Sequence, residues 1–564
     1  MSMLIKMIFA FTGPRTLREF QEQCRTPMAT QEKLLLDLLR ANASAAFGHE
    51  HSFESVRTFA EFQRAVPITS YEDIAPYVDR QLNGLPGQLT TSRPVLFVTT
   101  SGTTGKSKYI PVTAESKAAK SQQMRTWFSA MMRDYPGVAD AKTLSVVSPE
   151  VEELAPCGTP CGAESGHAYR SMPRAIAPMY SCPYETFEIT DYDAKYYTIV
   201  RIACGQSIGM ILTPNPSTVI LLAERMSQHT EEIIRDVRDG TLNERFEVAP
   251  EIRKKLANVL KADPGRAAAL EKAARDGHGV LLPKHVWPQQ QLVACWKGGN
   301  VGVYLQKFDR YFRPNLPVRD LGYYASEVRG SIVLDDAGPD GVLAIGTNVY
   351  EFFPADAANE PGGAELLRAD QLERGKRYFI YVTTAGGLYR YDMNDIIEVT
   401  GFYEAAPLIR FIQKGKGVVS FTGEKLYEAQ VVAAVDKALA AHNGHYEFIT
   451  AIGELQGDRP RYSFLIEFDG PGPTSGAETM LHGIETALRA QNAEYAAKRQ
   501  SGRIQPPTLR VIKPGEFARY RQSAKRDSQF KTVRLTSDGE FAKKFAVERE
   551  VFAEASRPDS SNDK

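Results

Sequence analysis

Apolar and polar residues follow two periods along this chain, and together the two periods predict a mixed α/β fold. From residue 17 to about residue 45, apolar positions recur at helical spacing, as in EKLLLDLLRANASAAF, and residues 219–275 have the same spacing. After Gly298, short β-branched runs bounded by turn residues, such as GVLAIG and YFIYVTT, predict strands. We therefore expect an α/β protein in which β-sheets are flanked by helices.

The pattern changes near residue 410, and the change predicts a domain boundary. A chain of 564 residues is too long for one ordinary hydrophobic core. Residues 1–410 are expected to form a large N-terminal domain. Residues 411–556, with alternating runs such as YEFITAIGE and RYSFLIEF, are expected to form a small, mobile C-terminal α/β domain. The polar residues 557–564 are expected to be a disordered tail.

The composition of the chain disfavours two classes of binding partner, nucleic acids and membranes. Lys and Arg together number 68, as do Asp and Glu, so no net charge favours DNA or an anionic membrane. No segment reaches the ~20 unbroken apolar residues that span a bilayer. Lys6 interrupts the apolar opening MSMLIKMIFAF, which we expect to begin a packed helix. The expected protein is a cytoplasmic monomer without a nucleic-acid or membrane partner.

The run SGTTGKSK, residues 101–108, is a candidate phosphate loop between the strand-like LFVTT and a helical pattern that resumes after Pro111. Its hydroxyls and backbone N–H groups suit phosphate oxygens, although a plain Ser/Gly turn has the same composition. A Walker loop is excluded, because the chain has Thr100 instead of glycine five residues before Gly105. The candidate phosphate-binding residues are Ser101, Gly102, Thr103 and Thr104.

Two further runs contain residues that suit a nucleotide. In YYASE, an aromatic ring can stack on a purine, a hydroxyl can hold a phosphate oxygen and a carboxylate can hold Mg²⁺. These residues are Tyr323, Ser326 and Glu327. In LYRYDMNDIIEVTGF, Asp395 can accept both ribose hydroxyls. The structural alternatives are a strand end with a solvated glutamate and an aspartate in a turn.

Together these runs resemble the motifs of the adenylate-forming superfamily, which includes acyl-CoA synthetases and luciferases. TSGTTGKSK is similar to its phosphate loop, YYASE to its aromatic motif, YRYDMND to its ribose-binding stretch and GKGVVSFTGEKL to its hinge. FAEFQRAVPITSYEDIAPYVDRQLNG, the run before YYASE and the ending QFKTVRL resemble one family within it, the auxin-responsive acyl acid–amido synthetases (the Gretchen Hagen family), in a bacterial form. The resemblance extends from about residue 15 to residue 545 and implies that residues 1–410 are an adenylation and acyl-binding domain.

The resemblance implies ATP and Mg²⁺ as cofactors and gives roles to lysines that would otherwise be interpreted as solvated surface residues. Lys531 stands where the superfamily has its C-terminal catalytic lysine, and Lys425 lies in the hinge-like stretch. With Glu327 these are the expected catalytic residues, and rotation of the small domain is expected to bring Lys531 to the phosphates. Lys414 stands where many relatives carry Arg and is expected to contact the nucleotide.

In this family the helix after the phosphate loop helps to line the acyl pocket, which makes Arg125, Trp127 and Phe128 candidate acyl-binding residues. Arg125 could pair with the substrate carboxylate, whereas Trp127 and Phe128 could equally belong to the core. The chain also departs from the family's pattern. Tyr324 replaces the usual small residue of the aromatic motif, and Asn394 replaces the glycine before the ribose-binding aspartate.

The resemblance implies an ATP-dependent ligase. The expected reaction adenylates a carboxylic acid, releases pyrophosphate and transfers the acyl group to an amine, expected to be an amino acid, to form an amide. An acyl-CoA ligase of the phenylacetate type, which forms a thioester, is the alternative, because the phosphate loop and the hinge do not separate the two. A non-catalytic nucleotide-binding protein is disfavoured, because Glu327, Asp395, Lys425 and Lys531 are all present.

Overall fold

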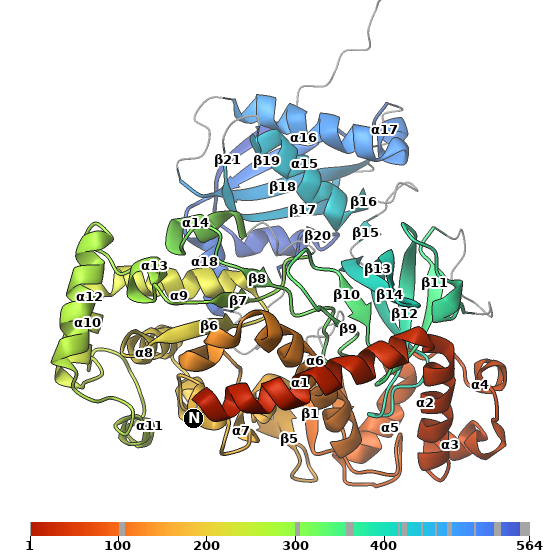
Figure 1. Cartoon of the computed structure of the whole chain (residues 1–564). Helices are drawn as coiled ribbons and strands as arrows, with labels where there is room; N and C mark the ends of the chain where they lie inside the picture. The colour runs from red at the N-terminus through yellow and green to blue at the C-terminus, as the bar shows by residue number, and fades with distance from the viewer. Residues whose placement is uncertain are drawn as a thin grey trace, which may run out of the picture. The chain divides into compact units, whose positions relative to one another are not determined.

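Two compact units, Met1–Ile412 and Gln413–Lys564, make up the chain. In both units sheets are flanked by helices, which confirms the predicted α/β class (Figure 1). The predicted domain boundary after residue 410 and the predicted mobility of the small domain remain predictions, and the predicted tail lies outside the described residues. The computed structural model describes residues 2–100, 108–298, 305–356, 366–414, 418–419, 426–440, 444–456, 459–470, 476–500, 504–523 and 532–552.

Three sheets build the larger unit (Figure 1). A parallel sheet has the order β3-β6-β7-β8, a second sheet the order β2-β1-β5-β4, and a third the order β11-β12-β13-β14-β10-β9. The strands are β1 (Leu96–Thr100), β2 (Lys108–Val112), β3 (Lys142–Ser145), β4 (Glu153–Leu154), β5 (Pro160–Gly162), β6 (Ile208–Leu212), β7 (Leu292–Ala294), β8 (Val318–Arg319), β9 (Ser331–Ile332), β10 (Gly341–Leu343), β11 (Val349–Pro354), β12 (Arg377–Thr383), β13 (Tyr391–Tyr403) and β14 (Ala406–Lys414).

The parallel sheet separates two hydrophobic cores, because alternate residues of a strand point to opposite faces. Met210 and Leu292 pack with the N-terminal helices and the other two sheets, whereas Ile211 and Val293 pack with helices α8 to α12. The helices of this unit are α1 (Ser2–Arg25), α2 (Pro27–Ala41), α3 (Ala46–Glu50), α4 (Phe59–Ala65), α5 (Tyr71–Leu82), α6 (Ala114–Asp134), α7 (Glu164–Arg170), α8 (Tyr192–Cys204), α9 (Pro216–Gln228), α10 (Thr230–Asp239), α11 (Pro250–Leu256), α12 (Pro264–Asp276), α13 (Pro283–Val286) and α14 (Phe308–Tyr311).

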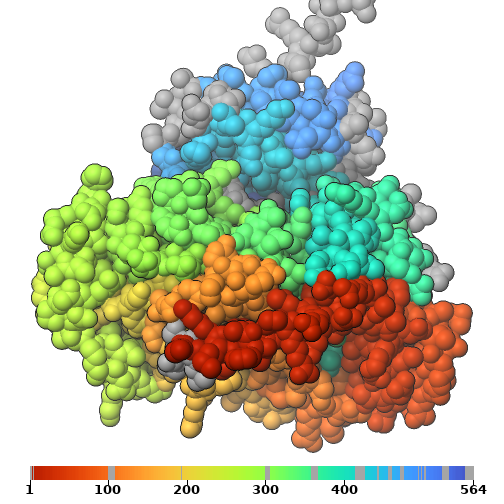
Figure 2. All heavy atoms as spheres, viewed as in Figure 1, coloured from red at the N-terminus to blue at the C-terminus, as the bar shows by residue number. Residues whose placement is uncertain are grey.

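The N-terminal helical pattern is divided into two helices. Helix α1 ends at Arg25 and α2 begins at Pro27, because proline lacks the N–H that would continue a helix and restricts the residue before it. Helix α1 packs on α6 along the surface of the larger unit and buries Ile5, so the opening segment does begin a packed helix (Figures 1 and 2). Within the described ranges, no helix has both the length and the apolar character needed to cross a bilayer.

A strand separates the candidate phosphate loop from the helix that the sequence predicts after Pro111. Strand β2 begins at Lys108, pairs antiparallel with β1, and helix α6 starts only at Ala114 with Thr113 as its N-cap. The run KYIPV is short and contains a proline, so its strand character comes from pairing with β1. The positive end of α6 therefore lies beyond a hairpin, and the helix predicted after Pro111 is confirmed by α6.

The smaller unit is a five-stranded mixed sheet with the order β20-β17-β18-β19-β21 and a two-stranded ribbon, β15-β16. Helices α15 and α16 pack together on one face of the sheet, and a cluster around Phe448 and Phe517 covers the other (Figure 1). Its elements are β15 (Val418–Val419), β16 (Leu426–Tyr427), α15 (Glu428–Ala440), β17 (Tyr446–Gln456), β18 (Arg459–Phe468), α16 (Ala477–Gln491), α17 (Ala493–Gln500), β19 (Thr508–Ile512), α18 (Glu516–Ser523), β20 (Leu535–Thr536) and β21 (Val547–Phe552).

The buried side chain of Asp320 connects the two segments that follow strands β7 and β8 of the parallel sheet. Asp320 follows β8 directly, is 3% exposed, and accepts hydrogen bonds from the backbone N–H groups of Lys297 at 2.5 Å and Gly322 at 2.6 Å. Its backbone oxygen accepts the indole N–H of Trp127 from α6 at 2.9 Å. Asp320 therefore ties the segments after β7 and β8 together beside the aromatic motif. Burial raises the pKa of this carboxyl to about 6.

The raised pKa of Asp320 predicts a pH-dependent contribution to stability. Because the folded state holds the proton more tightly than the unfolded state, the contribution is fully present below about pH 4 and is lost as the pH rises through about 6. Asp320→Asn does not titrate there. The wild type minus variant difference in unfolding free energy should therefore fall by about 2 kcal/mol between pH 4.5 and pH 7 (roughly 1.4 kcal/mol per pH unit up to the folded-state pKa). Calorimetric unfolding of both proteins over this range measures it, and a difference that grows with pH contradicts it.

Candidate active site

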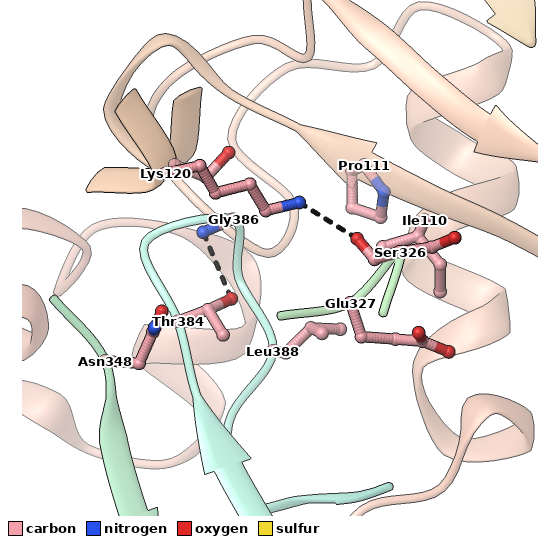
Figure 3. Close-up of a pocket in the computed structure, with 10 residues that line it drawn as sticks. Ile110, Pro111, Lys120, Ser326, Glu327, Asn348, Thr384, Gly386 and Leu388 are labelled. Carbon is pink, nitrogen blue, oxygen red and sulfur yellow. Dashed lines mark hydrogen bonds between the residues drawn. The ribbon is translucent and has the colours of Figure 1, made fainter. Parts of the chain in front are cut away.

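A pocket in the larger unit lies beside the aromatic motif (Figure 3). Five segments that are far apart in the sequence form its walls, and the two residues of the motif that were predicted to contact phosphate and metal are among them. The lining residues are Ile110 and Pro111 of β2, Ser116 and Lys120 of α6, Ser326 and Glu327 of the motif, Asn348 before β11, and Thr384, Gly386 and Leu388 of the turn after β12.

Glu327 is a partly exposed carboxylate at the wall of this pocket. Its side chain extends away from Lys120 in Figure 3. Burial is the main cause of the raised pKa of Tyr391, and the negative charge of Glu327 adds to it. No cluster of three or more Cys, His, Asp or Glu side chains that could hold a metal occurs among the described residues. Mg²⁺ does not require such a cluster, since it is commonly held by one or two carboxylates together with substrate phosphates.

Tyr323 and Asp395, 72 residues apart, are joined directly. The Tyr323 hydroxyl donates to Asp395 Oδ2 at 2.6 Å, and Asp395 is only 1% exposed. The Tyr323 ring is parallel to that of Phe411, with centroids 6.0 Å apart, and a Cβ at Gly330 would lie 2.3 Å from the ring. Burial raises the pKa of Tyr323 well above its usual range, and Asp395 adds to the shift. The ring is therefore largely enclosed, and its predicted stacking on adenine remains a prediction.

The backbone around Asp395 explains one departure from the family's pattern. Asn394 has φ +48°, in the left-handed region that glycine and asparagine adopt most readily. Asparagine can therefore replace the usual glycine without changing the turn. Arg390, at φ +47°, lies just before the same strand, and its guanidinium is paired with buried Glu351 at 3.0 Å. This buried ion pair fixes the start of the segment that carries Asp395.

Most of the phosphate-binding and lysine predictions cannot be placed. Residues 101–107, Lys425 and Lys531 lie outside the described residues. Lys414 ends β14, but its side chain is not described. Of the predicted catalytic and nucleotide-binding residues, the structure therefore brings together Tyr323, Ser326, Glu327 and Asp395, and the roles of the others remain predictions.

The three candidate acyl-binding residues of α6 do not share one environment. Arg125 is exposed, Phe128 is half-buried, and Trp127 is completely buried with its indole N–H bonded to Asp320. Trp127 contacts Phe128 edge to face, with ring centroids 5.2 Å apart. These positions favour a core role for Trp127. An acyl-binding role for the three residues remains a prediction.

The pocket also contains residues that the sequence did not single out. Lys120 is one of several lysines in an amphipathic helix, and no local pattern marks it. Thr384 and Gly386 belong to the run TTAGG, whose glycines between two strands could have indicated a special turn. Gly387 has φ +96°, and a Cβ there would lie 2.6 Å from Leu89 Cβ, so the turn requires glycine.

Solved structures and curated relatives are similar to this chain over most of its length. The structure of "GH3.15 acyl acid amido synthetase" superposes with a TM-score of 0.84 at 21% identity, covering 95% of this chain and 97% of that one. A 2-hydroxyisobutyryl-CoA ligase in the postadenylation state gives a TM-score of 0.52 at 12% identity, with 92% of each chain covered. Both share the fold.

Two plant relatives are each 25% identical to this chain. One is an indole-3-acetic acid-amido synthetase, GH3.8, of Oryza sativa subsp. indica, matched over 523 residues that cover 89% of this chain and 86% of the relative. The other is a jasmonoyl–L-amino acid synthetase, GH3.5, of Oryza sativa subsp. japonica, matched over 558 residues that cover 93% and 94%.

Family models match three successive parts of the chain. The GH3 family N-terminal domain matches residues 16–318, the central domain residues 341–414 and the C-terminal domain residues 429–540. The first match alone spans more than half of the chain. The family resemblance found in the sequence motifs is thereby confirmed, whereas the bacterial form remains a prediction. The chain belongs to the GH3 family.

Proposed function

We propose that this protein is an ATP-dependent acyl acid–amido synthetase. The observation that carries the proposal is that Ser326 and Glu327 line one pocket and that Tyr323 of the same motif bonds to Asp395, in a chain of the GH3 family. The curated relatives are named for joining an acyl acid to an amino acid, and that reaction class is the one proposed here. The substrates are a carboxylic acid, ATP and an amine, with an amino acid as the proposed acceptor.

The chemistry requires activation, because a carboxylate oxygen is a poor leaving group and the acid would simply protonate the amine. In the first half-reaction a carboxylate oxygen attacks the α-phosphorus of ATP, and the bond to pyrophosphate breaks. In the second, the amine attacks the acyl carbonyl, the bond to AMP breaks and the amine loses a proton. The site must therefore stabilise charge on phosphate first and admit an amine afterwards.

The residues of the candidate site fit the first requirement, which is to stabilise negative charge on the phosphates. Mg²⁺, when bound, would supply positive charge to the phosphates, and Glu327 is the carboxylate that would hold it. We propose that Ser326 and the hydroxyls of Ser101 and Thr103 bind phosphate oxygens and that Asp395 binds the ribose. Tyr323 fixes the orientation of the Asp395 carboxylate through its hydroxyl.

We propose that the smaller unit supplies two catalytic lysines. Family resemblance gives Lys531 and Lys425 the phosphate-facing roles, with a rotation of this unit between the two half-reactions. Closure would exclude water while the reactive adenylate is present, and rotation would open a path for the amine.

Thioester formation with coenzyme A is the less favoured alternative. The likeness to a CoA ligase concerns the fold, at 12% identity, whereas the family models and the named plant relatives are those of amido synthetases. Supplying the activated acid with either coenzyme A or mixed amino acids distinguishes the two acceptors.

Removing the charge of Glu327 should impair adenylation and weaken the dependence on metal. For Glu327→Gln we expect acid-dependent pyrophosphate release to fall roughly 100- to 1,000-fold, the scale of losing one preorganised stabilising group. A titration with Mg²⁺ at fixed ATP measures the change. Glu373→Gln, at an exposed position, is the matched control and should resemble the wild type. An unchanged Mg²⁺ requirement in Glu327→Gln would contradict the metal assignment.

The two half-reactions should be separable, because pyrophosphate leaves before the amine enters. Label should exchange between pyrophosphate and ATP when a substrate acid is present and every amine is absent. Lys531→Ala should slow this exchange roughly 100- to 1,000-fold without lowering the unfolding temperature. The control is Lys543→Ala, whose ammonium is exposed and paired with Glu540. Exchange that strictly required the amine would exclude the two-step scheme.

A further inference from the structure

Lys120 and Glu164 form an ion pair at the edge of the pocket. Lys120 Nζ lies 2.7 Å from Glu164 Oε2, and the two side chains are 16% and 12% exposed. The same ammonium donates to the backbone oxygen of Ser326 at 3.0 Å, as Figure 3 shows. One lysine of α6 therefore contacts both the first residue of α7 and the aromatic motif.

Tyr324 of the aromatic motif lies near the same carboxylate. Burial raises the pKa of its hydroxyl above the usual range, and the negative charge of Glu164 adds to the shift. The guanidinium of Arg329 lies over the Tyr324 ring, 5.1 Å from the centroid, and the two residues also form an antiparallel β-bridge. The aromatic motif is thus tied to Glu164 through Lys120, which donates to the backbone oxygen of Ser326.

We propose that Lys120 and Glu164 form a brace, here called the α7 brace, that positions Ser326 and Glu327 for the nucleotide and its metal. The proposal rests on the function proposed above, because it assigns these two residues as positioning residues for that site. Charge-assisted hydrogen bonds between partly buried groups are stronger and more directional than exposed ones. Such bonds can hold a short loop in one geometry, which a site that must place a carboxylate accurately requires.

Helices α6 and α7 do not need the brace in order to stay together. One helical turn away, Lys117 Nζ lies 3.0 Å from His167 Nε2 and 2.9 Å from Ser171 Oγ. His167 Nδ1 in turn lies 2.7 Å from Glu150 Oε1. Lys117 therefore links the same two helices through partners outside the aromatic motif. Lys117→Met is the matched control for Lys120→Met.

The test compares hydrogen exchange of the peptide spanning residues 322–331 in full-length variants. Its amides include Ala325, bonded to Val328 O at 2.8 Å, and Gly330, bonded to Tyr323 O at 2.8 Å. Lys120→Met should speed exchange in this peptide about tenfold, the effect of losing one charge-assisted hydrogen bond. Lys117→Met should leave it unchanged.

Kinetic measurements distinguish a positioning role of Lys120 from a purely structural one. Lys120→Met should raise the Mg²⁺ concentration needed for half-maximal pyrophosphate release about tenfold at an unchanged unfolding temperature. Lys120→Arg, which keeps the charge, should restore most of the loss. Equal effects of Lys117→Met and Lys120→Met, or a faster-exchanging peptide with an unchanged Mg²⁺ requirement, would overturn the proposal. If the wild type releases no pyrophosphate with any acid, the proposed function fails, and the exchange comparison still decides whether the brace exists.

Discussion

The hydrogen bond between Tyr323 and Asp395 is the contact on which the arrangement of this site depends. Tyr323 follows the last strand of the parallel sheet, whereas Asp395 lies in the long β13 of a different sheet. Both groups are buried, so an unmatched hydroxyl or carboxylate there would be unfavourable by several kcal/mol. The bond therefore fixes the distance between two sheets at one place. The pocket residues Ser326 and Glu327 follow Tyr323 by only a few positions, and their location depends on that distance.

Two other buried carboxylates support the same region from opposite sides. Asp320 holds the backbone just before Tyr323, and Glu351 pairs with Arg390 just before the strand segment that carries Asp395. A buried carboxylate requires partners, which makes each of these residues a fixed point. The departures from the family's motifs agree with this scheme. Asn394 keeps a left-handed turn that glycine would otherwise provide, and the guanidinium of Arg329 lies over the ring of the larger Tyr324.

Much of the fold could be predicted from the sequence, because helical and alternating periods record which faces are buried. The helical run near the N-terminus, the helix after Pro111, the strand before the phosphate loop and the αβ order of the smaller unit agree with the periods. Strand β2 could not be predicted, since its five residues owe their conformation to pairing with β1. The motif residues of the site were identified by resemblance. Lys120 and Asp320 were not, because tertiary contacts alone distinguish them from other charged residues.

The central claim is that the acid is activated by transfer of AMP to its carboxylate. The most direct measurement uses an acid whose carboxylate carries oxygen-18, together with ATP and an amino acid, and analyses the products by mass spectrometry. The account predicts that one carboxylate oxygen appears in AMP and the other stays in the amide. Label in inorganic phosphate, or amide formed with no label in AMP, would contradict activation as an acyl-adenylate.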